Sequence, residues 1–333
     1  MAENRHDGEA WPQAAILTEL PPVARLGPSF DPDRLLADLR CLSGKAWGGL
    51  KNETQAGADA AQLGWQSLAL RAIGGDAART DAGGPGLGEF ADTPLLAQTR
   101  YLAEVLASVP ARLRGVRLLA LRPGAHSPVH VDPACGLPWG TVRLHVPIVA
   151  QPQARLEIAG DAHIWQPGSF WYGDFTRPHQ VINDGPGTRV HLVIDSHITP
   201  ELLSLFPAEF RRPNVLDEVL FDRTQSPSRR ETSGELRCEF SLPGLGGAGR
   251  PPKARIDWHG GRLAYFLDGK PVCRLVHVGH DEFRFAGWTT QQTLRVHAGG
   301  TGHSVTMFIR TGKQAHAVQV DAVPVDAVPV VAS

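Results

Sequence analysis

The chain has 333 residues and a formal net charge of −1, from 33 Lys and Arg against 34 Asp and Glu. This length suits one large domain or two smaller ones. The balance of charge excludes the broad basic surface that attracts nucleic acid or anionic membranes, so we expect neither as a partner. No stretch approaches 18 consecutive apolar residues, and residues 1–20 lack the basic flank and apolar core of a signal peptide. We therefore expect a cytoplasmic location.

The composition favours a turn-rich β protein. The chain has 36 Gly and 27 Pro, and only 20% of its residues are charged. No two cysteines form a CxxC pair, so a zinc knuckle or a redox pair is not expected and reduced thiols are the default. The cysteines are Cys41, Cys135, Cys238 and Cys273.

The first hundred residues predict helices around a single strand. Residues 1–30 are irregular and contain several prolines. Asp31 as N-cap and Pro32 at the first helical position predict a helix over residues 31–42. The other expected elements are a loop at 52–64, a strand at 64–73, a glycine-rich loop at 74–89 and a second helix at 95–106.

From Val116 onward, short strand-like runs follow one another with turn signals between them. Such closely spaced strands are typical of a jelly roll or a similar double sheet. We therefore predict a mainly β fold, a double-stranded β-helix of jelly-roll or cupin-like type with flanking N-terminal helices. The expected strands cover residues 116–122, 141–150, 154–159, 169–173, 179–183 and 188–198.

A second, smaller β module is expected at the C-terminus. Residues 224–234 have the polar, breaker-rich composition of a linker, and a strand pattern resumes at Glu235. Residues 267–270 (LDGK) predict a two-residue hairpin turn. The predicted organisation is a domain at 1–223 with its core at 64–200, the linker, a β module at 235–320 and a disordered tail at 321–333.

The residues that suggest chemistry begin with His130-Val131-Asp132. Side chains two apart in an extended segment lie on one face, so the imidazole and the carboxylate can point at one metal ion. With a distant histidine they would form the facial triad of non-haem Fe(II) oxygenases, which leaves ligand positions open. A single HxD is weak evidence, because a surface turn pair has the same pattern. His179 leads a later strand, and the guanidinium fork of Arg189 suits a dicarboxylate.

Several spaced motifs, in order, resemble the aspartyl/asparaginyl β-hydroxylase family of Fe(II)/2-oxoglutarate oxygenases, which includes bacterial proline-hydroxylase-like members. The resemblance covers roughly Trp65 to Pro200. The matching pieces are GWQSLALRAIGG (64–75), VRLLALRPGAHSPVHVD (116–132), TVRLHVPI (141–148) and GSFWYGDFTRPHQVINDGPGTRVHLVID (168–195).

The resemblance implies a role for each matching residue. His130, Asp132 and His179 are the implied iron ligands, and Arg189 is the residue that would hold the distal carboxylate of 2-oxoglutarate. Some animal members have glycine where this chain has Asp132, so the ordinary triad is expected here. His145 matches a family histidine near the cosubstrate.

Further residues of the expected site leave alternatives open. Arg143 should share a strand face with His145 and contact a carboxylate of cosubstrate or substrate, or else form a structural ion pair. Likewise, His145 could be a core histidine bonded to the backbone. Arg177 stands where relatives often have a smaller or apolar residue, and we list it with Trp139 and Trp171 as candidate substrate residues. The two tryptophans could instead pack the barrel.

The expected function is hydroxylation of an amino acid, or of an amino-acid residue in a peptide or carrier-bound substrate. Fe(II) is the implied cofactor, with 2-oxoglutarate and O2 as cosubstrates and succinate and CO2 as coproducts. Desaturation, epoxidation or cyclisation with the same cofactors is an alternative. Two alternatives belong to other classes of protein: a non-catalytic cupin-like binding protein, and a cupin-type isomerase or dioxygenase.

The role of the C-terminal module stays open at this point. Its six histidines match no metal-ligand spacing, so scattered surface histidines are favoured. The module could bind a peptide or a carrier protein, mediate dimerisation or cover the barrel.

Overall fold

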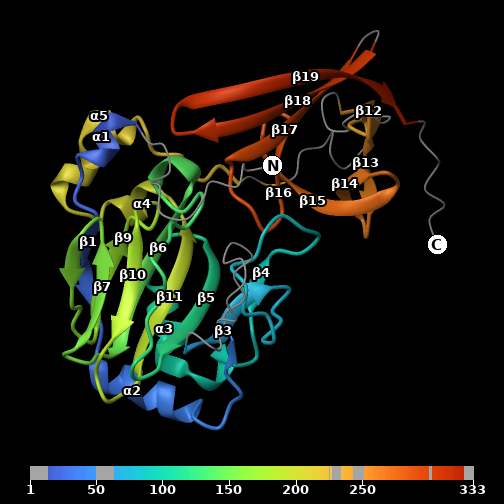
Figure 1. Ribbon diagram of the computed structural model, residues 1–333. Coiled ribbons are helices and arrows are strands. Elements are labelled where there is room, and N and C mark those ends of the chain that lie inside the picture. Colours follow the sequence, from blue (N-terminus) through green and yellow to red (C-terminus); the bar gives the residue numbers. More distant parts are fainter. Residues whose placement is uncertain are drawn as a thin grey trace. The chain divides into compact units, whose positions relative to one another are not determined.

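The computed structural model describes residues 14–49, 64–224, 226, 234–242, 251–299 and 302–325. The chain divides into two compact units (Figure 1). The N-terminal unit contains residues 1–83 and 90–221, and the C-terminal unit contains residues 84–89 and 222–333. Each unit has its own hydrophobic core.

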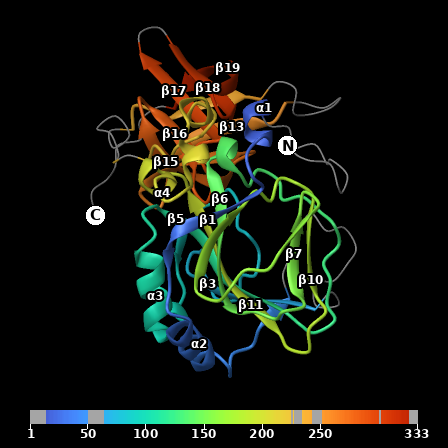
Figure 2. The same ribbon diagram turned by 90° about the vertical axis from the view of Figure 1, so that its left-hand side faces the viewer.

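The N-terminal unit is built on two antiparallel sheets that form opposite walls (Figure 2). The larger sheet has the strand order β1-β9-β6-β11-β5-β3-β2, with β4 beside β3, and the smaller has the order β10-β7-β8. The larger sheet comprises β1 (Val23–Ser29), β2 (Gly48–Gly49), β3 (Trp65–Ile73), β4 (Phe90–Asp92), β5 (Leu113–Leu121), β6 (Thr141–Val149), β9 (Ser169–Gly173) and β11 (Arg189–His197). The smaller comprises β7 (Ala154–Ile158), β8 (Asp161–His163) and β10 (His179–Asn183).

Two helices, α2 and α3, lie near the two positions expected from the sequence. Helix α2 (Pro32–Cys41) starts after Asp31, whose carboxylate accepts bonds from the backbone N–H groups of Asp33 and Arg34. The helix expected over 95–106 is broken, because a 3-10 turn (Leu96–Gln98) precedes α3 (Arg100–Ala107). Short helices α1 (Ala15–Thr18), α4 (Pro200–Leu203) and α5 (Pro213–Leu216) and 3-10 turns at Leu137–Trp139 and Ala208–Arg211 complete the unit.

Apolar residues divide between two sides of the larger sheet. The main core packs helix residues such as Leu35 and Leu102 against strand residues such as Leu144 and Leu192. A smaller apolar cluster joins Leu121 of the larger sheet to residues of the smaller one, and it includes Trp165 and Phe175. Polar and charged side chains also face the space between the two sheets, so a site can form there.

A tight turn at Gly168 precedes strand β9 of the larger sheet. Gly168 has φ of 77°, and a Cβ built on it would lie 2.1 Å from the carbonyl oxygen of Phe30. Only glycine meets both conditions without moving the backbone. The turn expected from Gln166-Pro167-Gly168 is therefore present, directly before β9.

The C-terminal unit contains a closed barrel of eight antiparallel strands, each paired with its neighbour in sequence, with β12 closing on β19. Asp268 and Gly269 both have positive φ in the tight turn between β14 and β15, as the LDGK motif predicts. The strands are β12 (Cys238–Ser241), β13 (Lys253–His259), β14 (Arg262–Leu267), β15 (Lys270–Gly279), β16 (Glu282–Phe285), β17 (Gln292–Gly299), β18 (Gly302–Thr311) and β19 (Gln314–Pro324).

The fold-class prediction is confirmed: the chain is mainly β, with a double sheet, flanking helices and a separate β module. The expected tail differs, because residues 321–324 extend β19 and pair with β12; residues 326–333 lie outside the described residues. Only Thr224, Ser226 and Gly234 of the expected linker are described. Within the described part of the chain, no helix has the length and apolar character needed to span a membrane.

Candidate metal centre and cosubstrate cavity

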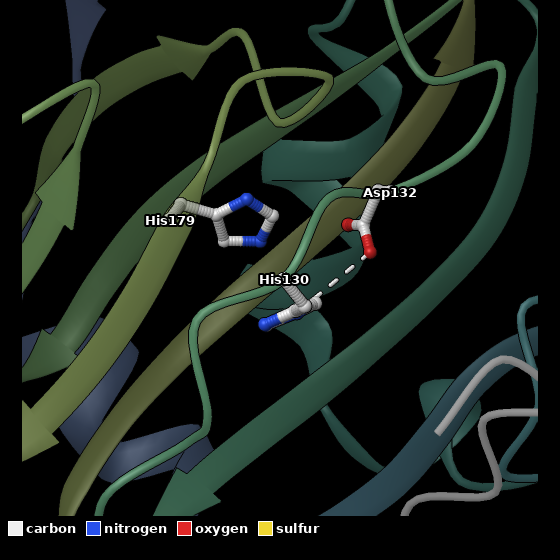
Figure 3. Close-up of side chains that lie close together, drawn as sticks. All are labelled: His130, Asp132 and His179. Atoms are coloured by element: carbon white, nitrogen blue, oxygen red, sulfur yellow. Dashed lines mark ion pairs between the residues drawn. The ribbon is translucent and has the colours of Figure 1, made fainter. Parts of the chain in front are cut away.

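His130 lies beside His179 because its segment runs along the edge of the smaller sheet. The two residues form an antiparallel bridge, in which each backbone N–H donates to the other's carbonyl oxygen at 2.9 Å. Asp132 is tied down in the same way, since its N–H donates to the carbonyl of Phe175 at 2.8 Å. Figure 3 shows the resulting group, whose possible ligand atoms all lie within 4.8 Å of one another.

Backbone carbonyls orient both imidazoles. Nδ1 of His130 lies 2.9 Å from the carbonyl oxygen of Pro128, and Nδ1 of His179 lies 2.9 Å from that of Arg177. A carbonyl can only accept, so each Nδ1 carries a proton, and Nε2 is the ring nitrogen left for a metal ion. Burial lowers the pKa of His179 to about 4, although the nearby Asp132 opposes this shift. His179 is therefore a neutral ligand at neutral pH.

The carboxylate of Asp132 stays ionised in this site. Burial by itself would raise its pKa, but Arg143, His179 and His130 outweigh that effect and the pKa lies below its ordinary value. Two imidazoles and one carboxylate on one side of a cavity are the donor set of the facial triad that binds non-haem Fe(II). The chemistry of these residues fits that ion.

Asp132 belongs to a buried charge layer, a row of acidic and basic side chains made of Asp132, Arg143, Asp195 and Arg117. Arg143 pairs with Asp132 on one side and with Asp195 on the other, where its Nε lies 2.7 Å from Oδ1 of Asp195. Arg117 adds an ion pair to Asp195 at 3.1 Å. Burial would raise the pKa of Asp195, but the two guanidinium groups hold it well below the ordinary range. Arg143 therefore forms ion pairs with two protein carboxylates, and its contact with a carboxylate of cosubstrate or substrate stays a prediction.

Arg189 differs from the other buried arginines because no carboxylate among the described residues pairs with it. Its one hydrogen bond runs to Nδ1 of His191 at 3.0 Å, and its residue is 5% exposed. Burial lowers its pKa to about 9, which leaves it charged at neutral pH. Burial, then the charge of Arg189, holds the pKa of both His145 and His191 well below the ordinary value, so both are neutral. A buried cation in neutral surroundings calls for an external anion.

One cavity connects the metal-binding group to Arg189. Its empty volume is about 690 Å³, including space open to solvent. His145 and Arg143 both line it, as does Arg117. Nε2 of His145 is buried with no hydrogen-bond partner in the described structure. The remaining wall consists of Trp65, Leu119, Ser127, Leu156, Phe175 and Val181.

The three candidate substrate residues are not part of this lining. Arg177 donates to the backbone carbonyls of Leu17 and Leu20 and pairs with Asp174, so it holds the segment before β1. Trp139 is buried in the 3-10 turn before β6. Trp171 stacks on Trp165, with ring centroids 5.2 Å apart. Their contribution to substrate binding stays a prediction.

The sequence reasoning missed four residues around the cavity. Asp195 and Arg117 complete the charge layer, and Trp165 and His191 line a pocket beside Arg189. The signal for two of them was available. Positions 189, 191 and 195 share one face of an alternating strand, so an inward Arg189 implies an inward His191 and Asp195. Arg117 and Trp165 had no comparable signal.

The comparisons with known proteins agree with this geometry. A family model described as Aspartyl/Asparaginyl beta-hydroxylase matches residues 34–198, which include every residue of the cavity wall. Through this segment the chain belongs to the aspartyl/asparaginyl β-hydroxylase family. It is an oxygenase, and Fe(II), 2-oxoglutarate and O2 are the cofactor and cosubstrates of its class.

Solved structures show partial likeness. An oxidoreductase of the 2OG-Fe(II) oxygenase family from Burkholderia pseudomallei is 13% identical, with 55% of this chain and 87% of that chain covered and a TM-score of 0.36. A prolyl hydroxylase from Trichoplax adhaerens, solved with a hypoxia inducible factor peptide fragment, is 11% identical, with 53% and 83% covered and a TM-score of 0.36. No curated protein matches the sequence.

Proposed function

We propose that this chain hydroxylates an amino acid, or an amino-acid residue within a peptide or carrier-bound substrate, and releases succinate and CO2 from 2-oxoglutarate. One observation carries the proposal. A group of two histidines and an ionised aspartate shares one cavity with a buried arginine that pairs with no carboxylate in the described chain. A metal ion and a dicarboxylate would satisfy both halves of that cavity.

The residues present divide the work of such an enzyme. His130, Asp132 and His179 would hold Fe(II), which supplies the redox chemistry that activates dioxygen when bound. Arg189 would fix the far carboxylate of 2-oxoglutarate and so orient its other end toward the metal. Apolar side chains in the wall, such as Leu119 and Phe175, limit water around the reacting groups.

Anaerobic spectroscopic titration tests the cofactor system first. Fe(II) and then 2-oxoglutarate are added to the wild type, to His130→Ala and to Arg189→Ala. We expect the weak visible charge-transfer band of a chelated 2-oxo acid in the wild type, its loss in His130→Ala and a weakened response in Arg189→Ala. An absent band in metal-loaded wild type would refute the oxygenase proposal.

Substrate class is tested next by succinate release. Free amino acids and short peptides are incubated aerobically with the loaded enzyme, and each product is weighed by mass spectrometry. A product heavier by one oxygen atom supports hydroxylation, and one lighter by two hydrogens supports desaturation instead. Recognition of a peptide or carrier protein by the C-terminal barrel remains a prediction, which the same assay tests by comparing a free amino acid with the same residue in a peptide.

A further inference from the structure

Arg189 forms a wall between two cavities. One is the cavity of the metal-binding group, and the other is a small pocket on the β6–β7 side of the sheet. Leu156 is the second residue that both cavities share. The small pocket has an empty volume of about 250 Å³, against about 690 Å³ for the cavity, and both volumes include space open to solvent. Its polar lining comes from Gln151, His163, Trp165 and His191.

The small pocket contains buried polar groups that the protein leaves unsatisfied. Nε1 of Trp165 and Nε2 of His163 are buried without a hydrogen-bond partner in the described structure. The indole N–H can only donate, so it requires an acceptor. Arg189 uses one N–H for His191, and no ion pair of the described residues includes it. Trp165 and Arg189 thus bring N–H groups to one pocket, and neither has a carboxylate partner among the described residues.

The acceptor must also be an anion. A water molecule would satisfy the indole N–H, but it would leave the buried charge of Arg189 without a counterion. A carboxylate meets both demands, because it has two oxygens and binds the guanidinium fork in a bidentate way.

We propose that Trp165 is a second binding residue for the distal carboxylate of the cosubstrate, donating its indole N–H to one carboxylate oxygen while Arg189 binds the group as a whole. This assignment rests on the proposed function, since it takes 2-oxoglutarate as the occupant of the larger cavity. It also gives the site a means of selecting a dicarboxylate over 2-oxo acids that end in a methyl group.

Packing holds the Trp165 indole in place for this contact. Its ring stacks on Trp171 with an interplanar angle of 7° and meets His145 edge-on at a centroid distance of 5.4 Å. Trp171 has its own partner, because its N–H donates to Oγ of Ser169 at 2.7 Å. The two stacked tryptophans therefore differ in one respect that matters: Trp171 has an acceptor within the protein and Trp165 does not.

That difference supplies a matched pair of variants. Trp165→Phe removes the unsatisfied N–H, and Trp171→Phe removes the satisfied one from the neighbouring ring. Each variant is loaded with Fe(II) anaerobically and titrated with 2-oxoglutarate and with 2-oxopentanoate, which has the same chain length without the distal carboxylate. For Trp165→Phe we expect the Kd of 2-oxoglutarate to rise about 10-fold or more, as for the loss of a hydrogen bond to a charged group. The Kd of 2-oxopentanoate should stay unchanged, and Trp171→Phe should change neither.

A merely structural role for Trp165 predicts another pattern. If Trp165→Phe weakens both ligands equally, or neither, the assignment is overturned while the oxygenase proposal stands. If wild type binds no 2-oxoglutarate, the oxygenase proposal itself falls. Should Trp165→Phe fail to fold, the wild type loaded with diamagnetic Zn(II) gives an independent measurement. Its indole ¹H–¹⁵N signals should include one that 2-oxoglutarate shifts and 2-oxopentanoate does not, and the absence of such a signal would overturn the assignment.

Discussion

The buried charge layer predicts that Asp195→Asn weakens both the fold and the metal site, although Asp195 is not itself a candidate ligand. Asp195 accepts from Arg143 at 2.7 and 3.3 Å and pairs with Arg117 at 3.1 Å. Removing its charge leaves two buried guanidinium groups with only Asp132 to balance them. Breaking a buried pair in this way costs about 3–5 kcal/mol, and the retained amide oxygen of Asn places the expected loss near 3 kcal/mol.

The effect on metal binding follows from the same contacts. Arg143 holds the Asp132 carboxylate, and without Asp195 the site loses a negative charge and the group that fixes Arg143. Loss of a residue that orients a ligand typically lowers metal affinity by about 10–100-fold. Urea denaturation of the metal-free protein measures the free energy of unfolding, and anaerobic competition with a chromophoric chelator measures Fe(II) affinity.

A surface ion pair in the same unit provides the control. Asp92 pairs with Arg71, but its side chain is 59% exposed, so Asp92→Asn should cost less than about 1 kcal/mol and leave Fe(II) affinity unchanged. The reasoning is refuted if Asp195→Asn is as mild as Asp92→Asn in the denaturation experiment and also binds Fe(II) with wild-type affinity.

Three further predictions concern stability. The pKa of His179 is about 4 in the folded protein and about 6.5 in the unfolded chain. The free energy of unfolding of the metal-free protein should therefore fall by on the order of 3 kcal/mol as the pH is lowered from 6.5 to 4. A free energy of unfolding that does not change with pH in urea denaturation would contradict this. In the barrel, Glu282→Gln should lower the free energy of unfolding by on the order of 3 kcal/mol in the same measurement. The Glu282 carboxylate is fully buried and pairs with three arginines, and its pKa is lowered to about 2 despite burial. The control is Glu239→Gln, at an exposed carboxylate. Asp31→Ala should lower the thermal midpoint through a loss of about 1 kcal/mol at the α2 N-cap, whereas Asp31→Asn, which keeps an acceptor, should not.

Local patterns account for a large share of what the sequence reveals. Asp31 and Pro32 define the start of α2, a strand-like run bounded by turn residues defines β11, and the turn at Asp268-Gly269 follows from residue types alone. Each of these depends on neighbours within a few positions. The break between the 3-10 turn and α3 was missed because the apolar spacing of residues 95–106 continues through it.

The site shows where local patterns end. The spacing of His130 and Asp132 suggests a common face, but the bridge that brings His179 beside them joins segments 49 positions apart in the numbering. The ion pair between Arg143 and Asp195 depends on the neighbouring strand, which places the two residues opposite each other in register. The role proposed for Trp165 depends on the lack of a hydrogen-bond acceptor for its indole N–H in the described structure. Such choices belong to tertiary packing, and no single segment encodes them.

The C-terminal unit includes residues 84–89, which come from a part of the chain far from its other residues in the sequence. Within the C-terminal unit, the N–H of Gly86 donates to Ala286 and its carbonyl accepts from Arg274, while Glu89 pairs with the fully buried Arg284 at 2.7 Å. A chain that begins at Asp222 would lack these contacts and leave the Arg284 guanidinium without that carboxylate. The polypeptide therefore enters the C-terminal unit, leaves it and returns more than 130 positions later. Such contacts between distant parts of the sequence slow folding, and the C-terminal unit is complete only when residues 84–89 have joined it.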